Sequence, residues 1–192
     1  MSLVMHEELQ GYYDALLLQS DEAEALAGDL SPGQINWQPT PDEWSIAQCL
    51  DHLVVVNNLL LPKMEVAAEQ TRERGLFAQG PFTYGWFGRL FIHALEPDVQ
   101  PNMQAPAIYR PAESNITAAL ERFLAVQQRL IDLLPQLIDL DLRQVRVTSP
   151  ALPLLRLQLG AWVAATVAHN WNHIRQAQRV RSMPAFPAAE PL

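Results

Sequence analysis

Apolar residues recur every three to four positions over most of the chain, the spacing that gathers them on one face of an α-helix. Four long segments follow this pattern: residues 3–27, 45–74, 114–138 and 153–181. No segment shows a convincing alternation of apolar and polar residues, the pattern typical of β-strands. The chain is therefore predicted to be all-α and to fold as a four-helix bundle.

Local signals mark where the predicted helices begin, end and bend. Gly28 is expected to end the first helix. Ser45 and Gln48 have the spacing of a capping box, in which each side chain accepts a hydrogen bond from a free backbone N–H at the start of the second helix. Pro62 has no backbone N–H and predicts a kink in that helix.

The remaining segments are predicted connections. Residues 29–44 hold three prolines and two tryptophans, which indicates an ordered loop pinned to the bundle surface. Residues 75–111 break the helical period and are interpreted as a crossover or lid that contains a short apolar helix at 86–94. Residues 184–192 are expected to form a loose tail. The length fits a single domain over residues 1–192.

The amino-acid composition narrows the kinds of function that this chain can have. The chain has 13 Lys and Arg against 21 Asp and Glu, a formal charge of -8, and no dense basic run, which argues against a nucleic-acid partner. No apolar stretch reaches the length of a membrane span and no signal peptide is evident, so a cytoplasmic protein without a membrane partner is expected. Cys49 is the single cysteine, which excludes an internal disulfide and a Cys-rich zinc module.

Three of the five histidines are predicted to face the core. His169 and His173 lie four residues apart, which places their Cβ atoms roughly 6 Å apart on one face of the fourth helix. His52 faces inward on the second helix. A buried imidazole with an unpaired nitrogen costs roughly 1 to 3 kcal/mol. Two interpretations follow: the three rings share one divalent cation, or each is a core residue bonded to a backbone carbonyl or a water molecule.

Two motifs carry a resemblance to a known family. One is W-x-P-x-x-x-x-W-S-I-x-x-x-x-x-H-L, and the other is H-N-x-x-H-I-x-Q. Their fixed positions are Trp37, Pro39, Trp44, Ser45, Ile46, His52 and Leu53, followed by His169, Asn170, His173, Ile174 and Gln176. In this order and at this separation, they resemble the DinB-like (DinB/YfiT-like) family of proposed metalloenzymes.

The resemblance implies a four-helix bundle in which His52, His169 and His173 bind a divalent metal. Zinc or nickel is the expected ion, with iron or manganese as further options. The resemblance also implies a small-molecule substrate and a homodimer. The 75–111 connection looks enlarged relative to shorter members of the family, which leaves the substrate class open.

Three imidazoles leave at least one coordination position open, as in catalytic sites, where a metal lowers the pKa of a bound water or thiol. Similarity to transferases and isomerases that use low-molecular-weight thiols, such as bacillithiol or mycothiol, favours transfer of a thiol to an electrophilic small molecule. A metal-dependent hydrolase is the second hypothesis. The third is a non-enzymatic stress-response bundle with a structural or vestigial metal site.

Four neighbours of these histidines carry polar or reactive side chains. Gln176 is expected either to orient a metal ligand or to bond another helix. Asn170 stands where H-E-x-x-H metalloproteases carry their catalytic glutamate, which argues against that class. Asp51 points about 100° away from His52 around the helix, so it is expected to be solvated or to contact a ligand from behind. Cys49 is interpreted as a buried small hydrophobe rather than a ligand.

The two remaining histidines and three aromatic residues of the 75–111 connection have simpler expected roles. His93 is expected to be exposed or bonded to a carbonyl rather than to serve as a fourth ligand. His6 is expected on the surface of the first helix. Tyr84, Trp86 and Phe87 either line a substrate pocket or, as the favoured interpretation, pack against the bundle.

Overall fold

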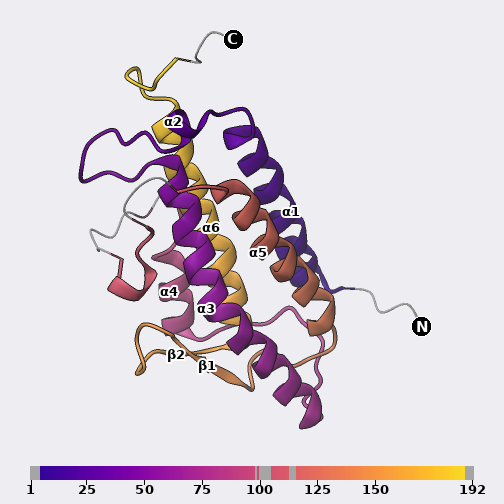
Figure 1. Cartoon of the computed structure of the whole chain (residues 1–192). Helices are drawn as coiled ribbons and strands as arrows, with labels where there is room; N and C mark the ends of the chain where they lie inside the picture. The colour runs from indigo at the N-terminus through magenta and orange to yellow at the C-terminus, as the bar shows by residue number, and fades with distance from the viewer. Residues whose placement is uncertain (1–4, 98, 100–104, 113–115, 189–192) are drawn as a thin grey trace.

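Four long helices form the body of the protein (Figure 1). The computed structural model describes residues 5–97, 99, 105–112 and 116–188. The long helices are α1 (Glu7–Ala27), α3 (Ile46–Glu73), α5 (Ala119–Leu133) and α6 (Leu159–Arg181). Both α1 and α3 pack against α5 and against α6. The predicted all-α four-helix bundle is confirmed.

The boundaries of the first two long helices follow the sequence signals. The first helix, α1, ends at Ala27, directly before Gly28. The Ser45 hydroxyl accepts a hydrogen bond from the Gln48 N–H at 3.1 Å, and the Gln48 side-chain oxygen accepts one from the Ser45 N–H at 3.0 Å. This capping box starts α3, as predicted. The helix continues through Pro62 to Glu73.

The third long helix is shorter than predicted. It was expected over 114–138, whereas α5 begins at Ala119. The preceding residue, Ala118, has a φ of 51°, so the backbone leaves the right-handed helical region just before the helix starts. At its other end the chain tightens into the 3-10 helix η2 (Leu134–Leu137). Residues 113–115 lie outside the described part of the chain.

A β-hairpin precedes the fourth long helix, which was wrongly predicted to begin near residue 153. Strands β1 (Arg146–Thr148) and β2 (Arg156–Gln158) pair antiparallel, with Val147 opposite Leu157. Both of these apolar residues are buried and the arginines beside them are exposed. Each strand spans only three residues, so the alternation is too short to stand out in the sequence.

The connections carry short helices of their own. Residues 29–44 contain α2 (Pro32–Ile35), which was not predicted. The short helix expected at 86–94 is confirmed as α4 (Trp86–His93), which packs on α6. A 3-10 turn, η1 (Ala107–Tyr109), contacts α3. No helix in the described part combines the length and apolar character needed to cross a membrane.

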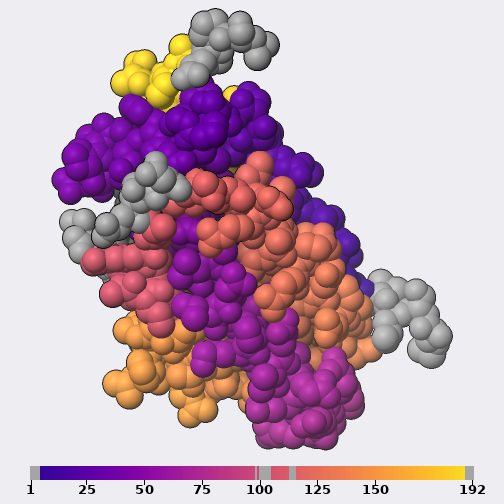
Figure 2. All heavy atoms as spheres, in the orientation of Figure 1, coloured from indigo at the N-terminus to yellow at the C-terminus, as the bar shows by residue number. Residues whose placement is uncertain are grey.

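The start of the C-terminal tail is held against the bundle rather than loose. The Phe186 ring meets the Trp37 ring edge-on at 5.6 Å, and the Pro187 carbonyl accepts a hydrogen bond from Gln34 Nε2 at 3.0 Å. This end of the bundle lies opposite the hairpin (Figure 1, Figure 2). The first part of the predicted loose tail, residues 184–188, therefore contacts the bundle, and the last four residues lie outside the described chain.

Glu8 of α1 anchors the 75–111 connection. Its carboxylate accepts hydrogen bonds from the Tyr84 hydroxyl, from the Phe82 N–H at 2.7 Å and from the Tyr12 hydroxyl at 3.1 Å. Burial, together with the Glu8 charge, raises the pKa of both tyrosines, so the hydroxyls stay protonated as donors. Tyr84 is thus a buried packing residue, as favoured, whereas Trp86 and Phe87 are exposed on α4.

His6 is only partly exposed, and its ring nitrogens are buried, in contrast to the predicted surface position. It directly precedes α1, and its ring meets Phe82 edge-on at 5.5 Å. Both ring nitrogens are buried without a hydrogen-bond partner in the described part of the chain. A side chain at Gly80 would meet this ring at 2.5 Å, so glycine leaves the room that His6 fills.

Candidate metal centre

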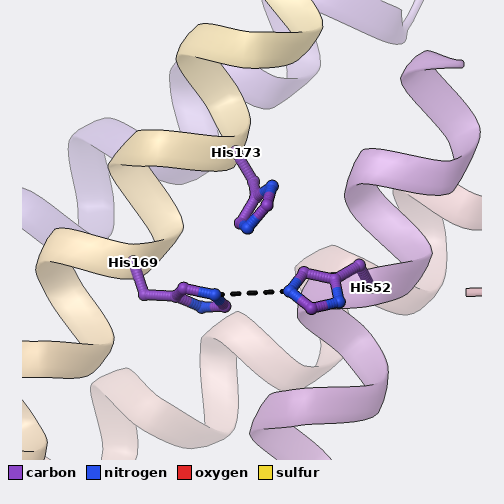
Figure 3. A group of neighbouring side chains, drawn as sticks. All are labelled: His52, His169 and His173. Atoms are coloured by element: carbon purple, nitrogen blue, oxygen red, sulfur yellow. Dashed lines mark hydrogen bonds between the residues drawn. The ribbon is translucent and has the colours of Figure 1, made fainter. Parts of the chain in front are cut away.

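Three histidines from two adjacent helices converge at one point (Figure 3). His52 comes from α3, and His169 and His173 come from successive turns of α6. One nitrogen from each ring lies within 4.8 Å of the other two. His52 Nε2 is 3.3 Å from His169 Nε2. The structure thus brings together the three residues that the sequence singled out as ligands.

Two of the rings are held with their Nε2 atoms free of protons. His52 Nδ1 lies 2.6 Å from the Tyr109 carbonyl oxygen, and His173 Nδ1 lies 2.9 Å from Gln176 Oε1. Both oxygens are acceptors, so Nδ1 is the protonated nitrogen in each ring and Nε2 presents a lone pair. Histidine ligands of metals are commonly held by such a bond from the far nitrogen.

The spacing of two of these nitrogens fits a divalent cation. Two nitrogens bound at about 2.1 Å to a tetrahedral ion lie about 3.4 Å apart, close to the 3.3 Å between His52 Nε2 and His169 Nε2. Imidazole nitrogens suit zinc, nickel, copper and iron. Among the described residues, the group consists of histidines only. The three rings therefore offer a neutral, all-nitrogen donor set.

The electrostatics keep these rings uncharged. Burial lowers the pKa of His52, although its bond to Tyr109 and the nearby Asp51 charge act in the opposite direction. Burial, followed by repulsion from His52, lowers the pKa of His169 to about 3. Burial and the two neighbouring imidazoles lower the pKa of His173 well below its ordinary value. Neutral imidazole is the form that binds metals.

These shifts predict that the metal-free protein loses stability in mild acid. Unfolded histidines take up protons below about pH 6.5, whereas the folded rings stay neutral, so the unfolded state binds more protons. The free energy of unfolding should fall as the pH drops from 6.5 toward 5, by about 1.4 kcal/mol per pH unit for one proton taken up on unfolding. Urea unfolding of chelator-treated protein at pH 7.5, 6.5 and 5.5 measures this. Equal stability at the three pH values would contradict the prediction.

Two groups at the centre were missed by the sequence reasoning. The Trp44 ring lies 4.9 Å from the His52 ring and stacks on the His173 ring at 5.6 Å. It had been expected only to pin a loop, yet its place directly before the N-cap of α3 puts it at the helix that carries His52. The second group is the Tyr109 carbonyl. The sequence could not indicate it, because every residue has a backbone carbonyl.

Asp51 is buried, so its interpretation as a solvated residue is wrong. Its Oδ1 atom pairs with Arg122 Nη1 at 2.8 Å, and its Oδ2 atom accepts a hydrogen bond from the Ala112 N–H at 2.9 Å. These contacts come from α5 and from the segment before it, which a helical projection of α3 alone does not reveal. The carboxylate therefore lies behind the cluster rather than in it.

Asn170 belongs to a chain of buried amides at the centre of the bundle. Its Nδ2 group donates to Gln127 Oε1 at 3.0 Å, and its Oδ1 atom accepts from Asn57 Nδ2 at 3.1 Å. Gln127 Nε2 in turn donates to Gln19 Oε1 at 3.0 Å. The four amides come from the four long helices and are at most 1% exposed. Asn170, which stands where the proteases carry their glutamate, therefore takes part in hydrogen bonds within the core.

Three other residues with polar or reactive side chains do not join the cluster. Cys49 is fully buried in the apolar core, where burial raises the pKa of its thiol to about 12, as expected of a small hydrophobe. His93 is exposed, as predicted, and its Nδ1 lies 2.7 Å from Glu96 Oε2. Gln176 contacts His173 within α6 rather than another helix.

The fold and the cluster define a helical-bundle protein with a three-histidine centre. The family model of the DinB superfamily matches residues 15–177, a span that includes all three histidines. The chain belongs to the DinB superfamily, as its two motifs predicted. No curated protein and no solved structure matches the chain.

Proposed function

We propose that this protein is a metal-dependent enzyme that activates a thiol for transfer to a small electrophilic molecule. In this proposal His52, His169 and His173 hold a zinc- or nickel-like cation. The observation that carries it is the convergence of three neutral imidazoles within 4.8 Å, with the Nδ1 atoms of His52 and His173 bonded to oxygen acceptors. A divalent cation with an open position lowers the pKa of a thiol or water bound there.

The surroundings of the cluster favour a thiol over water as the activated group. Hydrolytic zinc sites commonly pair the metal with a carboxylate that serves as general base. Here the neighbouring carboxylate, Asp51, is occupied by Arg122 and Ala112, and Asn170 is bonded within the amide chain. A thiolate is itself a strong nucleophile and needs no such base once its proton has passed to solvent.

The walls of the site support a small substrate. Trp44 covers His52 and His173, and η1 lies against His52 through the Tyr109 carbonyl. His169 and His173 are partly exposed residues, and we infer that a small molecule reaches the cluster from their side. A stacked aromatic wall beside a nucleophile suits an apolar or planar electrophile.

Thiol consumption tests this proposal. Protein loaded with zinc or nickel is mixed with cysteine, bacillithiol or mycothiol and a panel of alkyl, epoxide and activated-ester electrophiles. Accelerated loss of free thiol, absent in His52→Ala and retained in His93→Ala, is the expected result.

Two results would contradict it. Ester turnover that needs no added thiol would instead indicate a hydrolase. A change in melting temperature on metal removal, with no reaction in any mixture, would indicate a structural metal in a non-enzymatic bundle.

A further inference from the structure

The Tyr109 carbonyl that meets His52 belongs to a segment held at two points. The first point is the Tyr109 side chain, whose hydroxyl accepts a hydrogen bond from the Ala151 N–H at 3.2 Å, in the connection between the two hairpin strands. The second point is Ala112, three residues further along the chain, which forms hydrogen bonds to side chains of α3 through both its N–H and its carbonyl. Its N–H donates to Asp51 Oδ2 at 2.9 Å, and its carbonyl accepts from Gln48 Nε2 at 3.3 Å.

Asp51 makes the charged contact in this arrangement. Its side chain is buried and also pairs with Arg122 of α5 at 2.8 Å. A carboxylate that accepts a backbone N–H forms a stronger bond than a neutral acceptor does. Asp51 points about 100° away from His52 around α3. Apart from its charge, it therefore acts on that imidazole through the segment between Tyr109 and Ala112.

We propose that Asp51 is a positioning residue for the metal centre. By fixing Ala112, it holds the Tyr109 carbonyl against Nδ1 of His52, which keeps the proton on that nitrogen and directs Nε2 toward His169 and His173. This inference rests on the proposed metal site. Bonds of this kind behind a histidine ligand typically contribute 10- to 100-fold to metal affinity.

The test compares two ways of removing the same hydrogen bond. Asp51→Ala removes the acceptor, and Ala112→Pro removes the N–H donor while leaving the Asp51–Arg122 pair in place. Asp51→Asn retains an oxygen that can accept from Ala112 and serves as the conservative variant. Zinc affinity is measured by competition with a chromophoric chelator, and the visible spectrum of the cobalt-loaded protein reports the ligand geometry.

Asp141 provides the matched control. It is likewise buried, pairs with Arg143 at 2.8 Å and accepts from the Arg143 N–H at 3.1 Å. It lies where α6 begins, since the neighbouring Leu142 carbonyl bonds the Gly160 N–H. Asp141→Ala therefore removes an equivalent carboxylate more than two helical turns from His169.

The expected result is a 10- to 100-fold loss of zinc affinity and an altered cobalt spectrum in Asp51→Ala and Ala112→Pro. Asp51→Asn should recover most of the affinity, and Asp141→Ala should match the wild type even if its urea midpoint falls. If Asp51→Ala does not fold, the zinc affinity of Ala112→Pro alone tests the inference.

Two outcomes would overturn the inference, and they are distinguishable. If the wild type binds zinc and both bond-breaking variants bind it equally well, Asp51 has no positioning role and the metal site stands. If the wild type binds neither zinc nor nickel, the proposed function fails and the inference fails with it.

Discussion

Replacement of His169 by alanine should abolish stoichiometric binding of a divalent metal. The wild type is expected to retain close to one ion per chain when purified without chelator. His169 supplies one of three nitrogens, and His52 Nε2 faces it at 3.3 Å. Loss of a direct ligand should lower the affinity by more than about 100-fold, since even residues that only orient ligands contribute 10- to 100-fold. Plasma mass spectrometry of the purified chain measures the metal content.

His93→Ala is the matched control for this experiment. It also removes one imidazole, but from an exposed side chain that pairs with Glu96. Full metal content in this variant, with none in His169→Ala, would assign the ion to the cluster. Equal loss in both variants would contradict the assignment. No ion in the wild type, after incubation with zinc, nickel, manganese and iron, would mean that the histidines are core residues.

Replacement of the next residue, Asn170, by leucine should strongly destabilise the fold. Leucine has a similar size but forms no side-chain hydrogen bonds, so two buried atoms, Gln127 Oε1 and Asn57 Nδ2, lose the partner they have in Asn170. Each buried group left without a partner costs about 1–3 kcal/mol, so a total loss of about 2–6 kcal/mol is expected for the two groups. Urea unfolding of the metal-free protein should show a midpoint lower by on the order of 1–2 M.

Two further variants make this measurement specific. Asn172→Leu changes a partly exposed asparagine on the same helix and should leave the midpoint nearly unchanged. Asn57→Leu combined with Asn170→Leu removes both members of one hydrogen bond. The double variant should therefore lose less free energy of unfolding than the sum of the losses in the two single variants. Strict additivity would show that the amide chain does not act as a unit.

Consecutive residues of α6 thus have separate roles. His169 points toward α3 and the candidate metal centre, whereas Asn170, about 100° further around the helix, joins the amide chain across the bundle. We expect His169→Ala to affect metal content more than stability, and Asn170→Leu to do the reverse. The sequence HNWNH therefore combines a ligand pair with the polar centre of the core.

The sequence by itself determined the features that depend on local spacing. Helical periodicity gave the four long helices, because a period of 3.6 residues is visible within a single segment. The Ser45–Gln48 capping box follows from neighbours three residues apart, and the inward face shared by His169 and His173 follows from four. The approximate positions of the long helices and the shared face of His169 and His173 were accessible in this way, whereas the grouping of His52 with them was implied by the family resemblance.

Only the tertiary structure decided what surrounds those histidines. The Tyr109 carbonyl that fixes His52 lies 57 residues away in the chain, and the Ala112 N–H that meets Asp51 lies 61 residues away. The amide bond between Asn57 and Asn170 spans 113 residues. Such contacts depend on how helices and connections pack, and no period within one segment encodes them. Spacing and the family resemblance thus singled out the three candidate ligands, and the packing of distant segments decided their hydrogen-bond partners and orientation.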